Sequence, residues 1–117
     1  TVARRGWALN ASEAIDLIDK PNTFLIDLRE QSELEKQGII PNSVHIPYQD
    51  IQKNLQPGGF LHRRAGKESQ DLVFYCAFGE RSAMAVQAAQ DAGLKGARHI
   101  HGGLQAWKLA DGPLIPH

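Results

Sequence analysis

The sequence has a single cysteine, Cys76, and no net charge, with 13 lysines and arginines against 13 aspartates and glutamates. One cysteine can form neither an intramolecular disulfide nor a cysteine-cluster metal site, and it favours a reducing compartment, which we expect to be the cytoplasm. Balanced charge leaves no basic surface for a phosphate backbone. Nucleic acid is therefore not an expected partner.

Long hydrophobic runs are also absent. The longest, residues 72–78, is far shorter than the ~20 residues that span a bilayer, so we expect no membrane segment in this chain. A chain of 117 residues can bury its own core without a metal or a disulfide. It begins with Thr1 and shows no secretory signal. We therefore expect a single domain over residues 1–117, either processed or cut from a longer protein.

Short apolar runs alternate with helix-forming segments along the chain. Continuous apolar runs predict buried strands over residues 23–26 and 72–75. Short strands are also predicted over residues 43–46, which two prolines bound, and over residues 97–101. Helices are predicted over residues 11–20, 31–37, 48–55, 83–92 and 104–109, with a helical turn around 60–64. Asn10 and Glu13 predict a capping box at the start of the first helix. The alternation predicts an α/β domain with a mainly parallel sheet and helices on both faces, which binds ligands beyond the carboxyl ends of the strands.

Cys76 directly follows the most apolar of these predicted strands. It opens the segment Cys76-Ala77-Phe78-Gly79-Glu80-Arg81-Ser82, with a helix expected to begin near Ser82. The backbone N–H groups of such a loop and the N-terminus of the helix favour an anion, so we expect them to stabilise a thiolate. Arg81 would add a positive charge, and Gly79 allows a tight turn. The residues alone equally allow Cys76 to be a small buried apolar side chain.

Three segments of the chain resemble the signature motifs of rhodanese-like domains. The first segment is similar to the family pattern D-V-R, G-H-I-P-G-A, I-P. It consists of Leu25-Ile26-Asp27-Leu28-Arg29-Glu30, then Gly38-Ile39-Ile40-Pro41-Asn42-Ser43, then His45-Ile46-Pro47. Residues 76–82 resemble the active loop C-x-x-G-x-R-S. The last segment, with Gly102-Gly103, Trp107 and Gly112-Pro113-Leu114, resembles the closing G-G-x-x-x-W-x-x-x-G-x-P-L. The resemblance covers nearly the whole chain and implies a rhodanese-like α/β fold with a five-stranded, mainly parallel sheet.

The resemblance implies a sulfurtransferase that works through a persulfide on Cys76. Sulfane sulfur would move from thiosulfate or a persulfide donor to cyanide, a thiol or a partner protein, without a metal or organic cofactor. The substrate-binding loop would consist of Ala77, Phe78, Gly79, Glu80, Arg81 and Ser82. An alternative is a regulatory or sulfur-relay module of a larger protein, with low turnover of small molecules. Four residues separate Cys76 and Arg81, one fewer than in the related phosphatases and arsenate reductases, which disfavours those activities.

The chain departs from the family pattern at a few positions. Ile39 and Asn42 replace a histidine and a glycine, which we expect to affect only a structural turn. In the active loop, Ala77 stands where a second basic residue is common, Phe78 replaces a small or polar residue, and Glu80 adds a negative charge. We therefore expect thiosulfate, a dianion, to be held less firmly than in more basic loops. This favours a protein persulfide or a low-molecular-weight persulfide as the donor.

Charged residues just past a predicted strand end have a plainer interpretation. Asp27 and Arg29 are expected to form a structural charge pair, with a supporting role behind the catalytic loop as the alternative. His45, His99 and His101 are spaced like strand residues and are expected in strands or at strand ends. His99 and His101 would share one face, but two histidines without a third ligand are a weak metal signal.

A small basic cluster lies in the longest predicted loop. It consists of Arg63, Arg64 and Lys67. A solvated loop is the plain interpretation, and a rim for an anionic donor or a partner protein is the alternative. Trp107 is interpreted as a core anchor.

Overall fold

A five-stranded parallel sheet forms the centre of the protein. The structure is a computed structural model that describes residues 7–66 and 70–117. The strands are β1 (Ala8–Leu9), β2 (Thr23–Asp27), β3 (Val44–His45), β4 (Asp71–Tyr75) and β5 (Arg98–Ile100). Their order in the sheet is β1-β5-β4-β2-β3, and every neighbouring pair is parallel. The predicted α/β class and the five-stranded sheet are confirmed.

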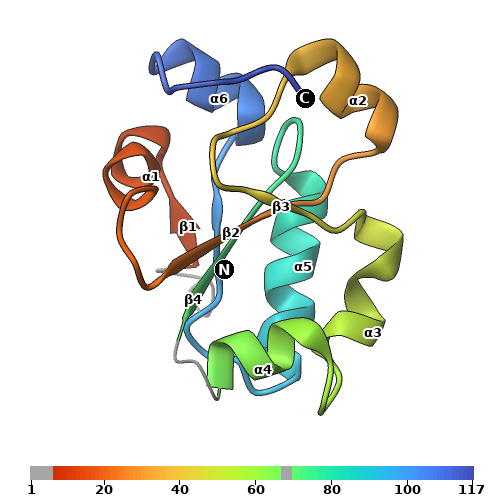
Figure 1. Ribbon diagram of the computed structural model, residues 1–117. Coiled ribbons are helices and arrows are strands. Elements are labelled where there is room, and N and C mark those ends of the chain that lie inside the picture. The colour runs from red at the N-terminus through yellow and green to blue at the C-terminus, as the bar shows by residue number, and fades with distance from the viewer. Residues whose placement is uncertain (1–6, 67–69) are drawn as a thin grey trace.

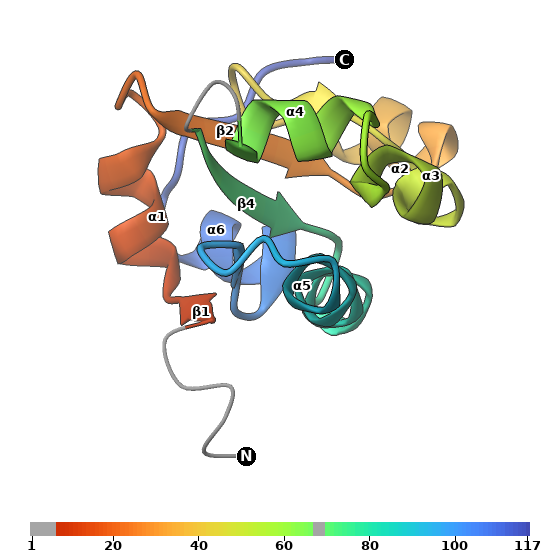
Figure 2. The ribbon, with the colours of Figure 1, turned by 90° about the horizontal axis from the view of Figure 1, so that it is seen from below.

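Helices cover both faces of this sheet. They are α1 (Ala11–Leu17), α2 (Gln31–Gln37), α3 (Ile51–Leu55), α4 (Phe60–Gly66), α5 (Glu80–Asp91) and α6 (Gly103–Leu109), with a 3-10 turn, η2 (Tyr48–Asp50), before α3. Helices α3, α4 and α5 lie on one face, and α1 and α6 lie on the other (Figures 1 and 2). Helix α2 follows β2 at the carboxyl end of the sheet. Within the described part of the chain, no helix has the length and apolar character needed to cross a membrane.

Each of the two central strands contains a continuous apolar stretch, residues 24–26 of β2 and 72–75 of β4, because both of its faces are buried there. Phe24 and Ile26 of β2 pack into one core cluster, whereas Leu25 between them packs into the other. Phe74 and Tyr75 of β4 divide in the same way. Successive strand residues point to opposite faces, so a strand covered on both sides has no polar alternation.

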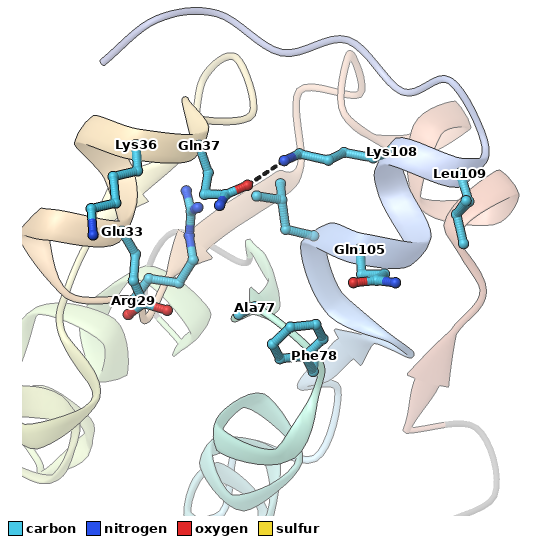
Figure 3. Close-up of a pocket in the computed structure, with 10 residues that line it drawn as sticks. Arg29, Glu33, Lys36, Gln37, Ala77, Phe78, Gln105, Lys108 and Leu109 are labelled. Carbon is cyan, nitrogen blue, oxygen red and sulfur yellow. Dashed lines mark hydrogen bonds between the residues drawn. The ribbon is translucent and has the colours of Figure 1, made fainter.

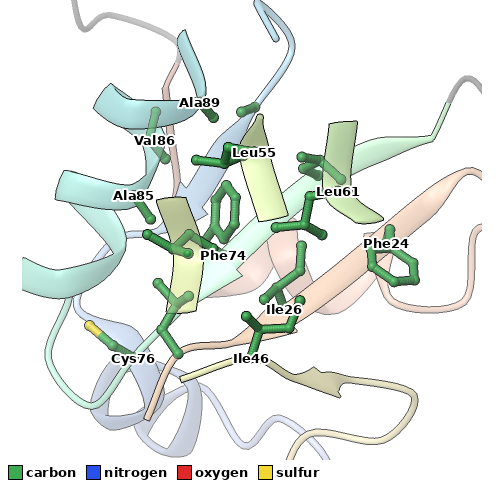
Figure 4. Close-up of a cluster of buried hydrophobic side chains, with 14 residues drawn as sticks. Phe24, Ile26, Ile46, Leu55, Leu61, Phe74, Cys76, Ala85, Val86 and Ala89 are labelled. Atoms are coloured by element: carbon green, nitrogen blue, oxygen red, sulfur yellow. The ribbon is translucent and has the colours of Figure 1, made fainter. Parts of the chain in front are cut away.

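The larger core cluster extends from the sheet to the active loop. Figure 4 shows Leu55, Leu61 and Val86 reaching the sheet from α3, α4 and α5. Cys76 belongs to the same cluster and is fully buried. The alanine-rich face of α5 lets that helix pack closely against the sheet. The loop between β4 and α5 is therefore held at one end by a central strand and at the other by a tightly packed helix.

Some element boundaries differ from the predicted ones. β1 was not predicted from the residues, because a strand of two residues has no periodicity to detect. It is held by backbone hydrogen bonds of 2.8 Å from His99 to Trp7 and from His101 to Leu9. Helix α1 has the predicted capping box between Asn10 and Glu13, but it ends earlier, at Leu17.

A second difference concerns the active loop. Helix α5 begins at Glu80, so Glu80, Arg81 and Ser82 form its first turn and are not part of the loop. Gly79 is the N-cap residue with a φ of 109°, a left-handed conformation that favours glycine. The loop itself is therefore shorter than predicted, and the helix N-terminus lies directly beside it.

The turn in which Asn42 replaces the family glycine has a left-handed backbone conformation at this residue. Asn42 has a φ of 69°, in the left-handed region. Asparagine tolerates this region better than most residues. The replacement is therefore accommodated locally, as expected.

Candidate active site

Cys76 lies at the carboxyl end of β4, near the middle of the sheet. Its Sγ accepts hydrogen bonds from the N–H of Gly79 at 3.1 Å and from the N–H of Ser82 at 3.4 Å. One donor comes from the loop and the other from the first turn of α5. Both donors and the helix N-terminus favour negative charge on the sulfur.

Ser82 connects Cys76 to a histidine from another strand. The Ser82 Oγ lies 3.7 Å from the Cys76 Sγ, 2.9 Å from His99 Nδ1 and 3.1 Å from the Gly79 carbonyl oxygen. Burial lowers the pKa of His99, and the nearby His101 lowers it further. Both effects favour the neutral imidazole. Sequence reasoning placed His99 only in a strand, because no motif or spacing links it to the loop.

Arg81 forms an ion pair with Glu33 of α2. Its guanidinium donates two hydrogen bonds to the Glu33 carboxylate, at 2.8 Å and 2.9 Å. These bonds lower the pKa of Glu33 to about 2, against the smaller opposing effect of partial burial. They also raise the pKa of Arg81. Arg81 therefore does not provide the unpaired positive charge expected from the sequence, because a carboxylate on α2 neutralises it.

We expect the Glu33–Arg81 pair to stabilise the fold at neutral pH and to fail in acid. The pKa of Glu33 is lowered from 4.5 in an unfolded chain to about 2. Since the unfolded chain therefore takes up the proton first, the contribution is full above about pH 4.5 and is lost as the pH falls towards about 2. Urea unfolding at about pH 7 and about pH 3 measures this. The decrease in the free energy of unfolding between the two pH values should be smaller in Glu33→Gln than in wild type.

Glu35→Gln is the matched control for this measurement, because Glu35 is exposed on the same helix. It should keep the wild-type acid sensitivity. Equal acid sensitivity of wild type and Glu33→Gln would contradict the prediction.

Asp27 and Arg29 form a buried ion pair behind the loop, as predicted. Asp27 Oδ2 lies 2.7 Å from Arg29 Nη2, and the two side chains are 1% and 0% exposed. Burial lowers the pKa of Arg29, but the hydrogen bonds and charge of Asp27 outweigh this and raise it overall. Tyr75 donates a hydrogen bond of 2.6 Å to the same carboxylate, and Arg29 donates one of 2.7 Å to the Gly38 carbonyl oxygen. The pair therefore ties β2, β4 and the end of α2 together beneath the loop.

The start of α6 holds the loop from the other side. The N–H groups of Leu104 and Gln105 donate to the carbonyl oxygens of Cys76 and Ala77, at 2.9 Å and 3.2 Å. A Cβ atom at Gly103 would lie only 2.4 Å from the Cys76 carbonyl oxygen. The second glycine of the Gly102-Gly103 pair is therefore required for this close approach.

A pocket of about 400 Å³ opens beside the loop, between α2 and α6 (Figure 3). Its lining consists of Arg29, Glu33, Lys36, Gln37, Ala77, Phe78, Leu104, Gln105, Lys108 and Leu109. Lys108 of α6 donates a hydrogen bond to the Gln37 side chain of α2 across one edge. Of the predicted loop residues, Ala77 and Phe78 line this pocket, whereas Glu80 is exposed on the first turn of α5.

The basic cluster lies away from this site. The Arg64 guanidinium packs on the rings of Phe24 and Phe60, 4.9 Å and 5.1 Å from their centroids, and Arg63 donates a hydrogen bond of 2.9 Å to the Gly58 carbonyl oxygen. Lys67 lies outside the described residues. Helix α4 packs near the amino ends of β2 and β4, opposite the end that carries Cys76 (Figure 1). These two arginines therefore do not form a rim around the candidate active site.

His45 and His101 lie at strand ends, as predicted. His45 ends β3, with its Nε2 2.6 Å from the Arg29 carbonyl oxygen, and His101 directly follows β5. In the ranges 7–66 and 70–117, no group of three or more His, Cys, Asp or Glu side chains is placed to hold a metal ion. Trp107 is fully buried in the smaller core cluster, as expected for a core anchor.

The sequence of this chain is similar to a family model and to known proteins. A sequence model of the rhodanese-like domain family matches residues 10–110. Thiosulfate sulfurtransferase/rhodanese-like domain-containing protein 3 of Mus musculus is 34% identical over 100 residues, which cover 81% of this chain and 64% of the mouse protein. A rhodanese domain-containing protein of Drosophila melanogaster is 30% identical over 102 residues, covering 83% of this chain and 92% of that protein. The chain thus spans just under two thirds of the mouse relative.

Further similar proteins include a larger enzyme and two proteins of solved structure. A tRNA uridine(34) hydroxylase of Yersinia pestis is 29% identical over 102 residues, which cover 87% of this chain but 28% of that enzyme. A solved structure from Rhodopseudomonas palustris, described as a protein of unknown function and possible tyrosine phosphatase, is 35% identical with a TM-score of 0.82. It covers 92% of this chain and 83% of its own. A rhodanese-related protein from Thermoplasma volcanium is 26% identical with a TM-score of 0.70, covering 94% of this chain and 98% of its own. From the family match, these relatives and the shared fold, the chain belongs to the rhodanese-like domain family.

Proposed function

We propose that this domain is a sulfurtransferase that carries sulfane sulfur as a persulfide on Cys76. The observation that supports this is the position of the Cys76 Sγ, which receives the N–H groups of Gly79 and Ser82 at the N-terminus of α5. Such donors stabilise a thiolate before the reaction, and the same loop can stabilise an anionic persulfide after it. Family membership agrees with this type of chemistry.

The reaction would proceed in two displacement steps. The Cys76 thiolate attacks the outer sulfur of thiosulfate, the sulfur–sulfur bond breaks, and sulfite leaves with the electron pair. A persulfide anion remains on Cys76. Cyanide or a thiolate then attacks the outer sulfur of this persulfide, and the sulfur–sulfur bond breaks. The outer sulfur leaves in thiocyanate or in a new persulfide, and the Cys76 thiolate is restored. Atoms and charge balance in both steps without a metal or an organic cofactor.

The surrounding residues would act by positioning the sulfur. Ser82 lies within 3.7 Å of the Cys76 Sγ and is held by His99 and by Gly79. Arg81 is bound to Glu33, so its part is to fix the first turn of α5 against α2. Orientation of the reacting atoms accounts for a large share of the rate in such displacements.

The donor is proposed to be a persulfide in preference to thiosulfate. The cationic group nearest the loop, Arg81, is paired, while Glu80 places an exposed negative charge on the first turn of α5. Both features weaken the attraction for a dianion. Acceptors would be cyanide, a thiol or a partner protein. A reducing compartment such as the cytoplasm suits the cycle, because it protects the free Cys76 thiolate from oxidation between turnovers.

A sulfur-relay module of a larger protein is the second candidate. The chain spans 64% of the mouse relative and 28% of the tRNA hydroxylase, so the domain also occurs inside longer proteins. A relay module would accept sulfur from a dedicated donor and turn over small molecules slowly. Steady-state thiocyanate formation by the isolated chain separates this candidate from an independent enzyme.

A phosphatase is a third candidate, because of the description of the Rhodopseudomonas neighbour. Two features of this chain oppose it. Four residues separate Cys76 and Arg81, which makes a ring smaller than a tetrahedral oxyanion requires. Arg81 is also bound to Glu33 and is not free to hold phosphate.

Intact-mass measurement tests the proposed function directly. The wild-type chain should gain the mass of one sulfur on incubation with thiosulfate or glutathione persulfide and should lose it when cyanide is added. Hydrolysis of an aryl phosphate should be negligible beside thiocyanate formation. Faster hydrolysis of the aryl phosphate, with no gain of sulfur from either donor, would replace this proposal with the phosphatase.

A further inference from the structure

We propose that the pocket between α2 and α6 binds the organic part of the sulfur donor, an anion with an apolar body and a separate acidic group. This inference rests on the proposed function of Cys76, because the pocket shares the loop residues Ala77 and Phe78 that follow it. Three features of the pocket support the chemical class of the ligand.

The first feature is a buried cationic donor without a partner. Arg29 lines the pocket and is fully buried. Its Nε and Nη2 bind Asp27 and the Gly38 carbonyl oxygen, but its Nη1 has no hydrogen-bond partner within the described residues. Figure 3 shows its guanidinium pointing up between α2 and α6, towards Gln37. Buried donors on charged groups are rarely left unpaired, so this atom indicates a place for an acceptor.

The second feature is the charge around that donor. Two charged residues of the lining are neutralised by partners outside it, Arg29 by Asp27 and Glu33 by Arg81. Lys36 and Lys108 therefore leave the lining with an excess of positive charge. Lys108 uses one of its three N–H groups on Gln37 and keeps the others for a ligand. A carboxylate or sulfonate in the pocket would meet Lys36 and Lys108 at the rim, with Arg29 buried behind them.

The third feature is the apolar wall. Phe78 is 62% exposed and Leu109 is 80% exposed, and both line the pocket together with Leu104 and Ala77. A ring placed against Phe78 would cover apolar surface that now faces water. The pocket volume of about 400 Å³ lies within the usual range of about 300–1,000 Å³ for small-molecule sites.

Together these features select among sulfur donors. Thiosulfate has no apolar part to cover Phe78, whereas an aryl donor with a carboxylate offers a ring to Phe78 and a second anionic group to Lys108. With 4-carboxybenzenethiosulfonate, the Cys76 thiolate would attack the outer sulfur, the sulfur–sulfur bond would break, and the sulfinate would leave with the electron pair. A persulfide anion on Cys76 would remain, so atoms and charge balance.

Binding is tested on the Cys76→Ser variant, which cannot take up sulfur. Titration with 4-carboxybenzenethiosulfonate, followed by amide chemical shifts, should produce saturable changes at Gln37, Phe78, Gln105 and Lys108. On this background, Lys108→Met should weaken binding about fivefold, because it removes an exposed charge that water partly screens. Phe78→Ala should weaken it about tenfold, because it removes the apolar wall.

Two controls and two ligands sharpen this test. Lys95→Met and Met84→Ala remove a charge and an exposed apolar side chain that are not part of the pocket lining, so binding should not change. Benzenethiosulfonate lacks the carboxylate, so its binding should respond to Phe78→Ala but not to Lys108→Met. Absence of saturable changes at the pocket, or binding that neither variant weakens, would overturn the inference.

The outcomes also separate this inference from the proposed function. If wild type forms a persulfide but the serine variant does not bind the ligand in the pocket, the pocket assignment alone is wrong. If the serine variant binds as expected but wild type never gains sulfur from any donor, the pocket assignment is supported and the proposed function is wrong.

Discussion

Replacing Cys76 by serine is expected to abolish sulfur uptake completely. In the proposed mechanism the sulfur atom of Cys76 is both the nucleophile and the atom that carries the transferred sulfur. A serine hydroxyl stays protonated near about pH 7 and cannot form a persulfide. The Cys76→Ser chain should therefore show no gain of mass with thiosulfate or glutathione persulfide, and no thiocyanate formation above the uncatalysed rate.

The fold of this variant should remain intact, which makes the result interpretable. Serine is close to cysteine in size, and its Oγ can accept the N–H groups of Gly79 and Ser82 that now bind the Sγ. Circular dichroism and the urea midpoint provide this control. A serine variant that kept wild-type thiocyanate formation would show that Cys76 does not carry the sulfur.

Replacing Asp27 by asparagine is expected to cause a large decrease in the free energy of unfolding. Asp27 is 1% exposed and accepts hydrogen bonds from the Arg29 side chain and from the Tyr75 hydroxyl. Asparagine would leave the Arg29 charge buried without a counter-charge, at a cost of about 3–5 kcal/mol in the free energy of unfolding. Since domains of this size are stable by only about 5–15 kcal/mol, a large part of the total would be lost.

Urea unfolding at about pH 7 measures this effect, with Asp50→Asn as the matched control. Asp50 pairs with Lys53 at 3.6 Å on the surface, where the side chains are 42% and 74% exposed. That pair should contribute less than about 1 kcal/mol, because solvent screens it. An equal decrease in the free energy of unfolding in the two variants would contradict the prediction that burial makes the Asp27–Arg29 pair the more stabilising one.

The predicted secondary structure was most accurate where a segment has many apolar residues. β2 and β4 were predicted to within a residue at each end, because strands buried on both faces have continuous apolar sequences. β1 was missed because its two residues pair through the backbone of β5 and need no side-chain pattern. The start of α5 was placed too late, because Gly79 caps it through its backbone conformation and provides no side chain to detect.

The sequence by itself determined the α/β class, the position of Cys76 after the most apolar strand and the pairing of Asp27 with Arg29. Each depends on residues that are close in the chain, so local patterns are sufficient to predict it. The Glu33–Arg81 pair and the Ser82–His99 contact join residues 48 and 17 positions apart. The pocket likewise needs α2 and α6 to meet over the loop. These features were decided only by the tertiary structure, because the order and register of the strands set which distant side chains come within bonding distance.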